Sequence, residues 1–310
     1  MSEVKALSAQ PMLEHASVQA LLAGAIDYAG LFPPASRDLA TVVQDYRTHR
    51  GGTDAWSLGR LVVPVARLDA LAEEALPGWR LEAAGESTAW HLSGLVGKDA
   101  AADTAAIAAF NRAQSSYAVV DSVESRATTV EQVRALGGLF DGLVHFVELP
   151  LAVDLPPLVS AIREIGACAK IRTGGVTIDA IPDARDVARF LQACHEGGVA
   201  FKATAGLHHP LRGDYRLTYE ERSPCGTMFG YLNVLLAAAQ ARNGAPIDQL
   251  IVTLEAKSHS LLGITDAEIR WEGLRLSAEQ LVDVRAHFAL AFGSCSFREP
   301  LDELIALMST

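Results

Sequence analysis

The 310-residue sequence lacks any apolar run long enough to cross a membrane, and its amino-terminal segment lacks the basic start and apolar stretch of a signal peptide. Its four cysteines form no CxxC pair and show no zinc-like spacing, so they are expected to be reduced thiols. Basic runs are also missing, and the net charge of −11 argues against a nucleic-acid partner. These absences predict a cytoplasmic protein with no membrane partner, no metal and no other cofactor, acting on a small molecule.

No low-complexity tract, linker or internal repeat divides the chain. Half of the residues are hydrophobic, which is enough to build one large core. We therefore expect residues 1–310 to form a single domain, because barrel domains often exceed 250 residues. The sequence leaves open whether copies of the chain associate as a homo-oligomer.

Short apolar runs alternate with longer amphipathic, alanine-rich stretches. The runs are continuous and rich in β-branched residues, as expected for parallel strands buried on both faces. Strand and helix alternating at this pitch predict repeated βαβ units and an α/β fold, the (β/α)8 TIM-type barrel. The eight expected strands are 23–31, 60–65, 91–96, 117–121, 143–149, 167–173, 199–205 and 288–294.

The expected helices lie between these strands or after the last one. They cover 100–114, 129–139, 184–195, 228–242 and 302–308. The connection 206–227, between strand seven and its helix, is long and polar, and such insertions usually carry function. The C-terminal third is expected to add elements to the barrel: 250–256 is a candidate extra strand, and 269–277 resembles a short hairpin.

Two of the expected buried strands carry a lysine within apolar sequence. Lysine is rarely buried without a reason, because removing an ammonium group from water is costly. The alternation of a strand places Lys170 and Arg172 on one face of ACAKIRT, and Lys202 and Thr204 on one face of VAFKATA. Both lysines precede a glycine that would end the strand, so both are expected near the carboxyl end of the barrel, where such enzymes hold their active sites.

Two ammonium groups that share a dry pocket cannot both stay charged at low cost. We expect their repulsion to lower one pKa and leave one amine neutral and nucleophilic. A neutral lysine that attacks a carbonyl group forms a Schiff base, which can promote cleavage of a carbon–carbon bond. The alternative is that both lysines bind a phosphate or carboxylate as point charges.

Three motifs resemble deoxyribose-phosphate aldolase, a class I aldolase barrel: KIRTGG, FKATAG and FGSCS. The resemblance implies that Lys170 forms the Schiff base, that Lys202 lowers its pKa, and that Asp121, closing the fourth strand, is the acid/base residue. The sequence departs from that family at His208-His209-Pro210, in the long insertion and at Cys295. These departures weaken what the resemblance implies about the substrate more than what it implies about the scaffold. The loops expected to face an anion contain Gly174, Gly175, Gly206, Gly293, Ser294 and Ser296.

Four further residues are candidates for the site. His208 and His209 lie in a loop bounded by glycine and proline, so both can point into one cavity for acid/base work or metal binding. Glu148 should lie at the same rim, where a carboxylate can pair with Lys170 or move protons. Asp27 lies among apolar residues and needs a partner, for which one of the central lysines is a natural candidate. Structural roles for these residues, such as capping a turn, remain open.

The sequence thus predicts a Schiff-base lyase that acts on a small oxo-compound with a phosphate or carboxylate group. Arg172 is the best candidate to hold that group. A metal-dependent lyase or isomerase using His208, His209 and Glu148 is the first alternative. A non-catalytic barrel that binds a small anion is the second.

Overall fold

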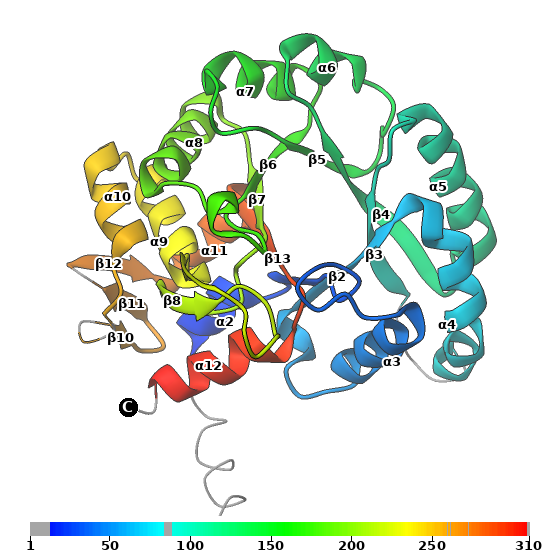
Figure 1. Cartoon of the computed structure of the whole chain (residues 1–310), viewed down its shortest axis with the longest axis horizontal. Helices are drawn as coiled ribbons and strands as arrows, with labels where there is room; N and C mark the ends of the chain where they lie inside the picture. The colour runs from blue at the N-terminus through cyan, green and yellow to red at the C-terminus, as the bar shows by residue number, and fades with distance from the viewer. Residues whose placement is uncertain (1–12, 84–88, 259, 261, 272, 309–310) are drawn as a thin grey trace, which may run out of the picture.

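A closed barrel of parallel strands forms the centre of the protein. The computed structural model describes residues 13–83, 89–258, 260, 262–271 and 273–308. Within this part, the strand order around the barrel is β1-β13-β7-β6-β5-β4-β3-β2, which confirms the predicted TIM-type fold. Figure 1 shows the barrel with helices around its outside. Its strands are β1 (Ile26–Tyr28), β2 (Leu58–Pro64), β3 (Trp90–Leu95), β4 (Ala118–Arg126), β5 (Val144–Glu148), β6 (Cys168–Arg172), β7 (Phe201–Thr204) and β13 (Ala289–Ser294).

Every expected barrel strand overlaps an observed one, and the largest difference lies in β4. The prediction ended this strand at Asp121, whereas β4 continues to Arg126. Its second half, SVES, is polar but buried, because these side chains find partners inside the barrel. Ser122, for example, donates a hydrogen bond to the carbonyl oxygen of Val144. A search for apolar runs therefore stops too early on this strand, and it misses Glu124.

The helices follow the strands and bury one face against them. In α8, Val187, Phe190, Leu191 and Cys194 recur at helical spacing and are fully buried. The helix ends at Gly198, whose φ of 65° favours glycine. The helices are α2 (Ala16–Leu22), α3 (Leu39–Arg50), α4 (Leu68–Ala83), α5 (Ala100–Gln114), α6 (Val130–Ala135), α7 (Leu155–Glu164), α8 (Ala184–Gly197), α9 (Tyr231–Arg242), α10 (Ile247–Glu255), α11 (Ala278–His287) and α12 (Arg298–Met308).

The C-terminal third differs from the expectation at one segment. The candidate extra strand 250–256 lies mostly in helix α10, so this interpretation is wrong. Leu250, Thr253 and Leu254 are the buried residues of α10, and their spacing of three and four is that of a helix face. The expected hairpin is confirmed as β11 (Glu268–Trp271) and β12 (Leu274–Ser277), which β10 (Gly263–Ile264) extends to a small sheet (Figure 1).

The long connection after β7 contains a hairpin of its own, β8 (Gly213–Arg216) paired with β9 (Cys225–Met228). The helix that follows begins at Tyr231 rather than at Met228, because Met228 pairs with Gly213 in this hairpin. Asn233 anchors the connection. Its side chain is fully buried, accepts a hydrogen bond from the Arg212 N–H and donates two to backbone carbonyl oxygens at the end of α10.

Within the described ranges, no helix has the length and apolar character that crossing a membrane requires.

The anchoring role of Asn233 gives a stability prediction. Asn233→Ala removes one buried and two part-buried hydrogen bonds to backbone groups, so we expect the free energy of unfolding to fall by about 2–4 kcal/mol. Asn243→Ala, at the exposed end of the same helix, is the matched control and should change it by less than about 0.5 kcal/mol. Chemical denaturation measures both variants, and equal effects would contradict the anchoring role.

Candidate active site

The two predicted lysines lie side by side inside the barrel. Lys170 of β6 and Lys202 of β7 are paired in the register of these strands. Lys202 is completely buried, and Lys170 is 4% exposed. Sequence alternation therefore placed both amines correctly. Only Lys170 reaches the cavity described below, whereas Lys202 lies beneath the cavity surface.

A carboxylate that the sequence analysis missed lies between the two amines. Glu124 of β4 is 2% exposed, and its two oxygens contact different lysines. Its Oε2 lies 2.7 Å from the Lys170 Nζ, and its Oε1 lies 2.5 Å from the Lys202 Nζ. The Ser93 hydroxyl donates a further hydrogen bond to Oε1. The signal that could have identified Glu124 is a glutamate in a segment that continues the alternation of an apolar strand.

Two further carboxylates complete the surroundings of the lysines. The Asp27 Oδ2 lies 2.5 Å from the Lys202 Nζ, so the expected lysine partner of Asp27 is confirmed. The Glu148 Oε2 lies 3.0 Å from the Lys170 Nζ, which confirms that pair as well. Arg126 in turn pairs with Glu148. The result is a chain of alternating charges with three anions and three cations, in the order Asp27, Lys202, Glu124, Lys170, Glu148 and Arg126.

These carboxylates reverse the expected effect of burial on Lys202. Burial alone would lower the pKa of Lys202, but Asp27 and Glu124 outweigh it and raise this pKa above its usual value. Burial would likewise raise the pKa of Glu124, but Lys202 and Lys170 hold it well below its usual range. The expectation of direct repulsion between the two amines is therefore corrected: Glu124 separates them, and Lys202 is a fixed cation.

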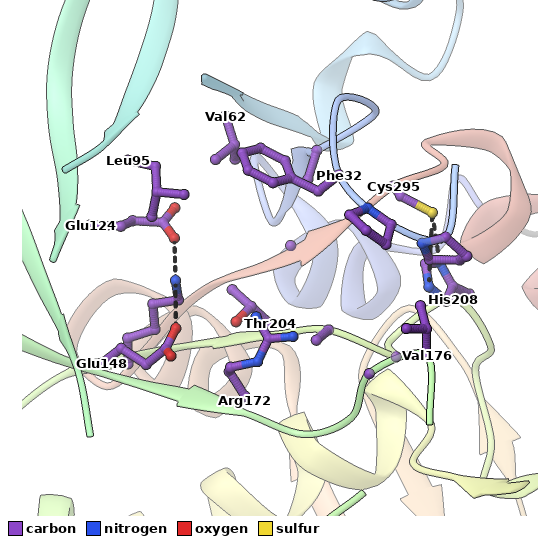
Figure 2. A pocket seen from close by; sticks show the side chains of 18 of the residues that line it. Phe32, Val62, Leu95, Glu124, Glu148, Arg172, Val176, Thr204, His208 and Cys295 are labelled. Carbon is purple, nitrogen blue, oxygen red and sulfur yellow. Dashed lines mark hydrogen bonds and ion pairs between the residues drawn. The ribbon is translucent and has the colours of Figure 1, made fainter. Parts of the chain in front are cut away.

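A cavity of about 270 Å³ opens at the carboxyl ends of the strands (Figure 2). The terminal residues of β3 to β7 all line it, so it lies where barrel enzymes hold their chemistry. Apolar side chains such as Phe32, Val62 and Leu95 form one wall. The predicted site residues on its surface are Glu148, Lys170, Arg172, Gly175, Thr204, Gly206, His208 and Gly293.

Three residues predicted to face an anion do not line the cavity. Gly174 packs behind its surface, where an added Cβ would lie 3.3 Å from the Ala205 carbonyl oxygen. The Ser294 hydroxyl lies 3.1 Å from the His208 Nδ1, so it orients the imidazole. Ser296 directs its backbone N–H to the Ser294 oxygen. Ser294, the last residue of the eighth strand, therefore supports His208, and the Ser296 hydroxyl accepts a hydrogen bond from the Glu299 N–H at the start of α12, so neither serine is offered to a ligand.

His208 lies at the side of the cavity opposite Glu148 (Figure 2). Burial and, to a smaller extent, His209 lower its pKa to about 4, so the imidazole is neutral at pH 7. Its Nδ1 faces Ser294, and among the described residues the Cys295 sulfur, at 3.9 Å, is the only hydrogen-bonding atom found for its Nε2. A neutral imidazole with one oriented nitrogen and one available nitrogen can accept a proton from a ligand.

His209 turns away from the cavity, so the prediction that both histidines share it is wrong. Its Nδ1 lies 2.8 Å from a Glu303 oxygen, and its ring stacks on Tyr215 with centroids 3.5 Å apart. The expected set of His208, His209 and Glu148 is not brought together. In the part of the chain that the structure describes, no group of three or more metal-binding side chains is close enough to hold an ion.

Asp121 also lies outside the cavity. It pairs with Arg60 and His91, near the amino ends of their strands, where these residues line a separate depression. Burial would raise the pKa of Asp121, but Arg60 and His91 outweigh it and lower this pKa. Asp121 is therefore an ion-paired carboxylate at the other end of the barrel. Glu124, three residues later on β4, is the carboxylate that lies beside Lys170, where Asp121 was expected.

The charge chain predicts a specific acid sensitivity. The pKa of Glu124 and that of Glu148 lie below the ordinary value of 4.5, so their stabilising contribution is complete above pH 4.5 and is lost as the pH falls through the lowered values. Below pH 4.5, we expect the wild type to lose up to about 1.4 kcal/mol more unfolding free energy per pH unit than Glu124→Gln.

Denaturation curves from pH 6 to pH 3 measure this difference. Glu148→Gln should differ from the wild type in the same direction but by less. Glu74→Gln, which changes an exposed glutamate, should lose the same unfolding free energy as the wild type. Parallel curves for the wild type and both site variants would contradict the assigned ion pairs.

No protein-family model matches the chain, and a search of curated proteins finds no significant match. The function of the protein must therefore be inferred from the geometry of its site.

Proposed function

We propose that the protein is a Schiff-base lyase, similar in chemistry to class I aldolases, that acts on a small oxo-compound with an anionic group. The observation that carries this proposal is the unequal placement of the two lysines. Lys170 reaches the cavity between two carboxylates, whereas Lys202 is sealed beneath it. One amine is placed to react, and the other is placed to organise the charges around it.

Lys170 must lose a proton before it can attack a carbonyl carbon. Glu124 and Glu148 each have an oxygen within 3.0 Å of its Nζ, so either carboxylate can take this proton without a large movement. The neutral amine then adds to the carbonyl carbon. The resulting carbinolamine loses its oxygen as water and leaves a cationic Schiff base.

The cationic Schiff base accepts electrons from the bond that breaks. In a substrate with a hydroxyl group on the β-carbon, a base removes the hydroxyl proton and an aldehyde forms. The electron pair of the carbon–carbon bond moves into an enamine. Protonation of the enamine carbon and hydrolysis then release the second product and restore the lysine.

His208 is the residue best suited to accept the hydroxyl proton and to return it to the enamine carbon. It faces Glu148 across the cavity, its imidazole is neutral, and Ser294 orients it. Lys202 contributes as a positioning residue, because its charge holds Glu124 ionised between the two amines.

Borohydride trapping tests the covalent step. The wild type mixed with small carbonyl compounds and sodium borohydride should gain the mass of the reduced adduct on the peptide that contains Lys170. Lys170→Met should abolish this adduct, because no other lysine lines the cavity within the described residues. Lys98→Met, which removes an exposed lysine, should leave it unchanged.

Failure of every carbonyl compound to form an adduct at Lys170 would overturn the proposal. If the wild type and Lys170→Met then bound the same small acid and differed only in affinity, the non-catalytic anion-binding alternative would be favoured.

Deuterium exchange tests the role of His208. An enamine intermediate exchanges the α-protons of a bound carbonyl compound with D₂O, which NMR follows directly. His208→Gln should slow this exchange by about 10²- to 10⁴-fold while Lys170 still forms the trapped adduct. His209→Gln is the matched control and should stay within a few-fold of the wild type. An unchanged rate in His208→Gln would assign the proton transfer to another group.

The pKa of His208 is about 4, so its imidazole stays neutral between pH 8 and pH 6. The part of the deuterium-exchange rate that depends on neutral His208 should therefore stay constant over this range and decrease only as the pH approaches 4. A loss of exchange centred near pH 6.5 that His208→Gln removes would contradict this environment.

A further inference from the structure

The charges around Lys170 leave one cation unbalanced at the cavity. Asp27, Glu124 and Glu148 balance Lys202, Lys170 and Arg126 through the contacts given above. Arg172 also lines the cavity, but it forms no ion pair or hydrogen bond with any residue in the described ranges. Arg172 is exposed at the end of β6, and an unpaired guanidinium at a cavity surface can hold an anion and balance one negative charge.

The position of Arg172 limits which part of a substrate it can hold. Arg172 lies two residues after Lys170 on β6, and Thr204 lies two residues after Lys202 on β7. Arg172 and Thr204 are paired in register, so they form the layer directly above the two lysines, about 7 Å along the strands. Figure 2 shows Arg172 beside Thr204, on the same side of the cavity as Glu148. An anion held there lies close to the carbon that Lys170 attacks.

The opposite side of the cavity does not favour an anion. His208 is neutral there, and burial raises the pKa of the Cys295 thiol. The carboxylate of Glu299 lies 3.7 Å from the His208 Nδ1 and accepts a hydrogen bond from the Tyr219 hydroxyl. Glu299 itself does not line the cavity, but among the described residues no arginine or lysine lines this side, so a phosphate dianion there would find only neutral groups in front of a carboxylate.

From this asymmetry we infer that the substrate is a 2-oxo acid, whose carboxylate lies on Arg172 and Thr204 directly beside the carbonyl group that Lys170 attacks. The inference rests on the proposed function and narrows its substrate class. A carboxylate carries the single charge that Arg172 can balance. The cavity volume of about 270 Å³ also fits a short acid, since drug-sized ligands occupy roughly 300–1,000 Å³.

The reaction then has a defined course. The amine of Lys170 and the 2-oxo group form the Schiff base with loss of one water. Cleavage between the third and fourth carbons sends the electron pair to the enamine and the C4 hydroxyl proton to His208, and an aldehyde leaves. Protonation at the third carbon and addition of water release a shorter 2-oxo acid. No oxidant, reductant or second substrate is required.

Trapping with matched carbonyl compounds tests the substrate class. Pyruvate, its neutral methyl ester and dihydroxyacetone phosphate are each reduced onto the wild type, and the concentration for half-maximal labelling of Lys170 is measured. We expect pyruvate to label at the lowest concentration. Arg172→Met should raise the value for pyruvate by about 10- to 100-fold and change that for methyl pyruvate by less than about three-fold.

Arg185→Met, which removes an exposed arginine from α8, is the matched control and should leave all values unchanged. Arg172→Lys should recover part of the preference for pyruvate. Two results would overturn the 2-oxo acid inference and leave the Schiff-base proposal intact. One is labelling of Lys170 by methyl pyruvate or dihydroxyacetone phosphate at lower concentrations than by pyruvate. The other is an equal effect of Arg172→Met on all three compounds. Absence of any adduct at Lys170 would overturn both.

Discussion

The site depends on one buried carboxylate that holds two ammonium groups apart. Glu124 contributes one oxygen to Lys170 and the other to Lys202, and both contacts lie inside the barrel. A buried charge is tolerable only when it is paired, so each member of this set requires the others. The barrel thereby holds ionised side chains at fixed positions, and a ligand that enters the cavity meets them already oriented.

The cavity above this set is electrostatically one-sided. The side next to Lys170 carries paired charges and an unpaired guanidinium, whereas the side next to His208 carries neutral donors and acceptors. A ligand with an anionic end and a neutral hydroxyl end therefore has a single favourable orientation. The orientation follows from which strands supply the side chains. Residues two apart on one strand occupy successive layers of the barrel, so Arg172 and Thr204 form the layer next to Lys170 and Lys202.

The barrel and the lysine pair could be predicted from the sequence because both follow from periodicity. Apolar runs located all eight strands approximately, and alternation placed Lys170 and Lys202 on the same interior surface. The search for apolar runs could not find Glu124, because its strand is polar there; only the alternation continued past Asp121 places it inside the barrel, and its partners come from strands distant in sequence. The divergence of His208 and His209 was equally hidden, since it depends on Glu303 of α12 and on Tyr215 of the hairpin.

The burial of Asp27 and Lys202 limits the routes by which small molecules can enter and leave the cavity. These side chains lie beside Lys170 inside the barrel and are almost inaccessible to solvent, so the cavity is closed on their side. In the proposed reaction, the substrate, the products and the water for hydrolysis would then share the opening at the carboxyl ends of the strands. In the proposed cleavage the aldehyde is free while the other fragment is still bound to Lys170, so the aldehyde can leave before water releases the second product. The closed side of the cavity thus gives both products of the proposed reaction a single route out.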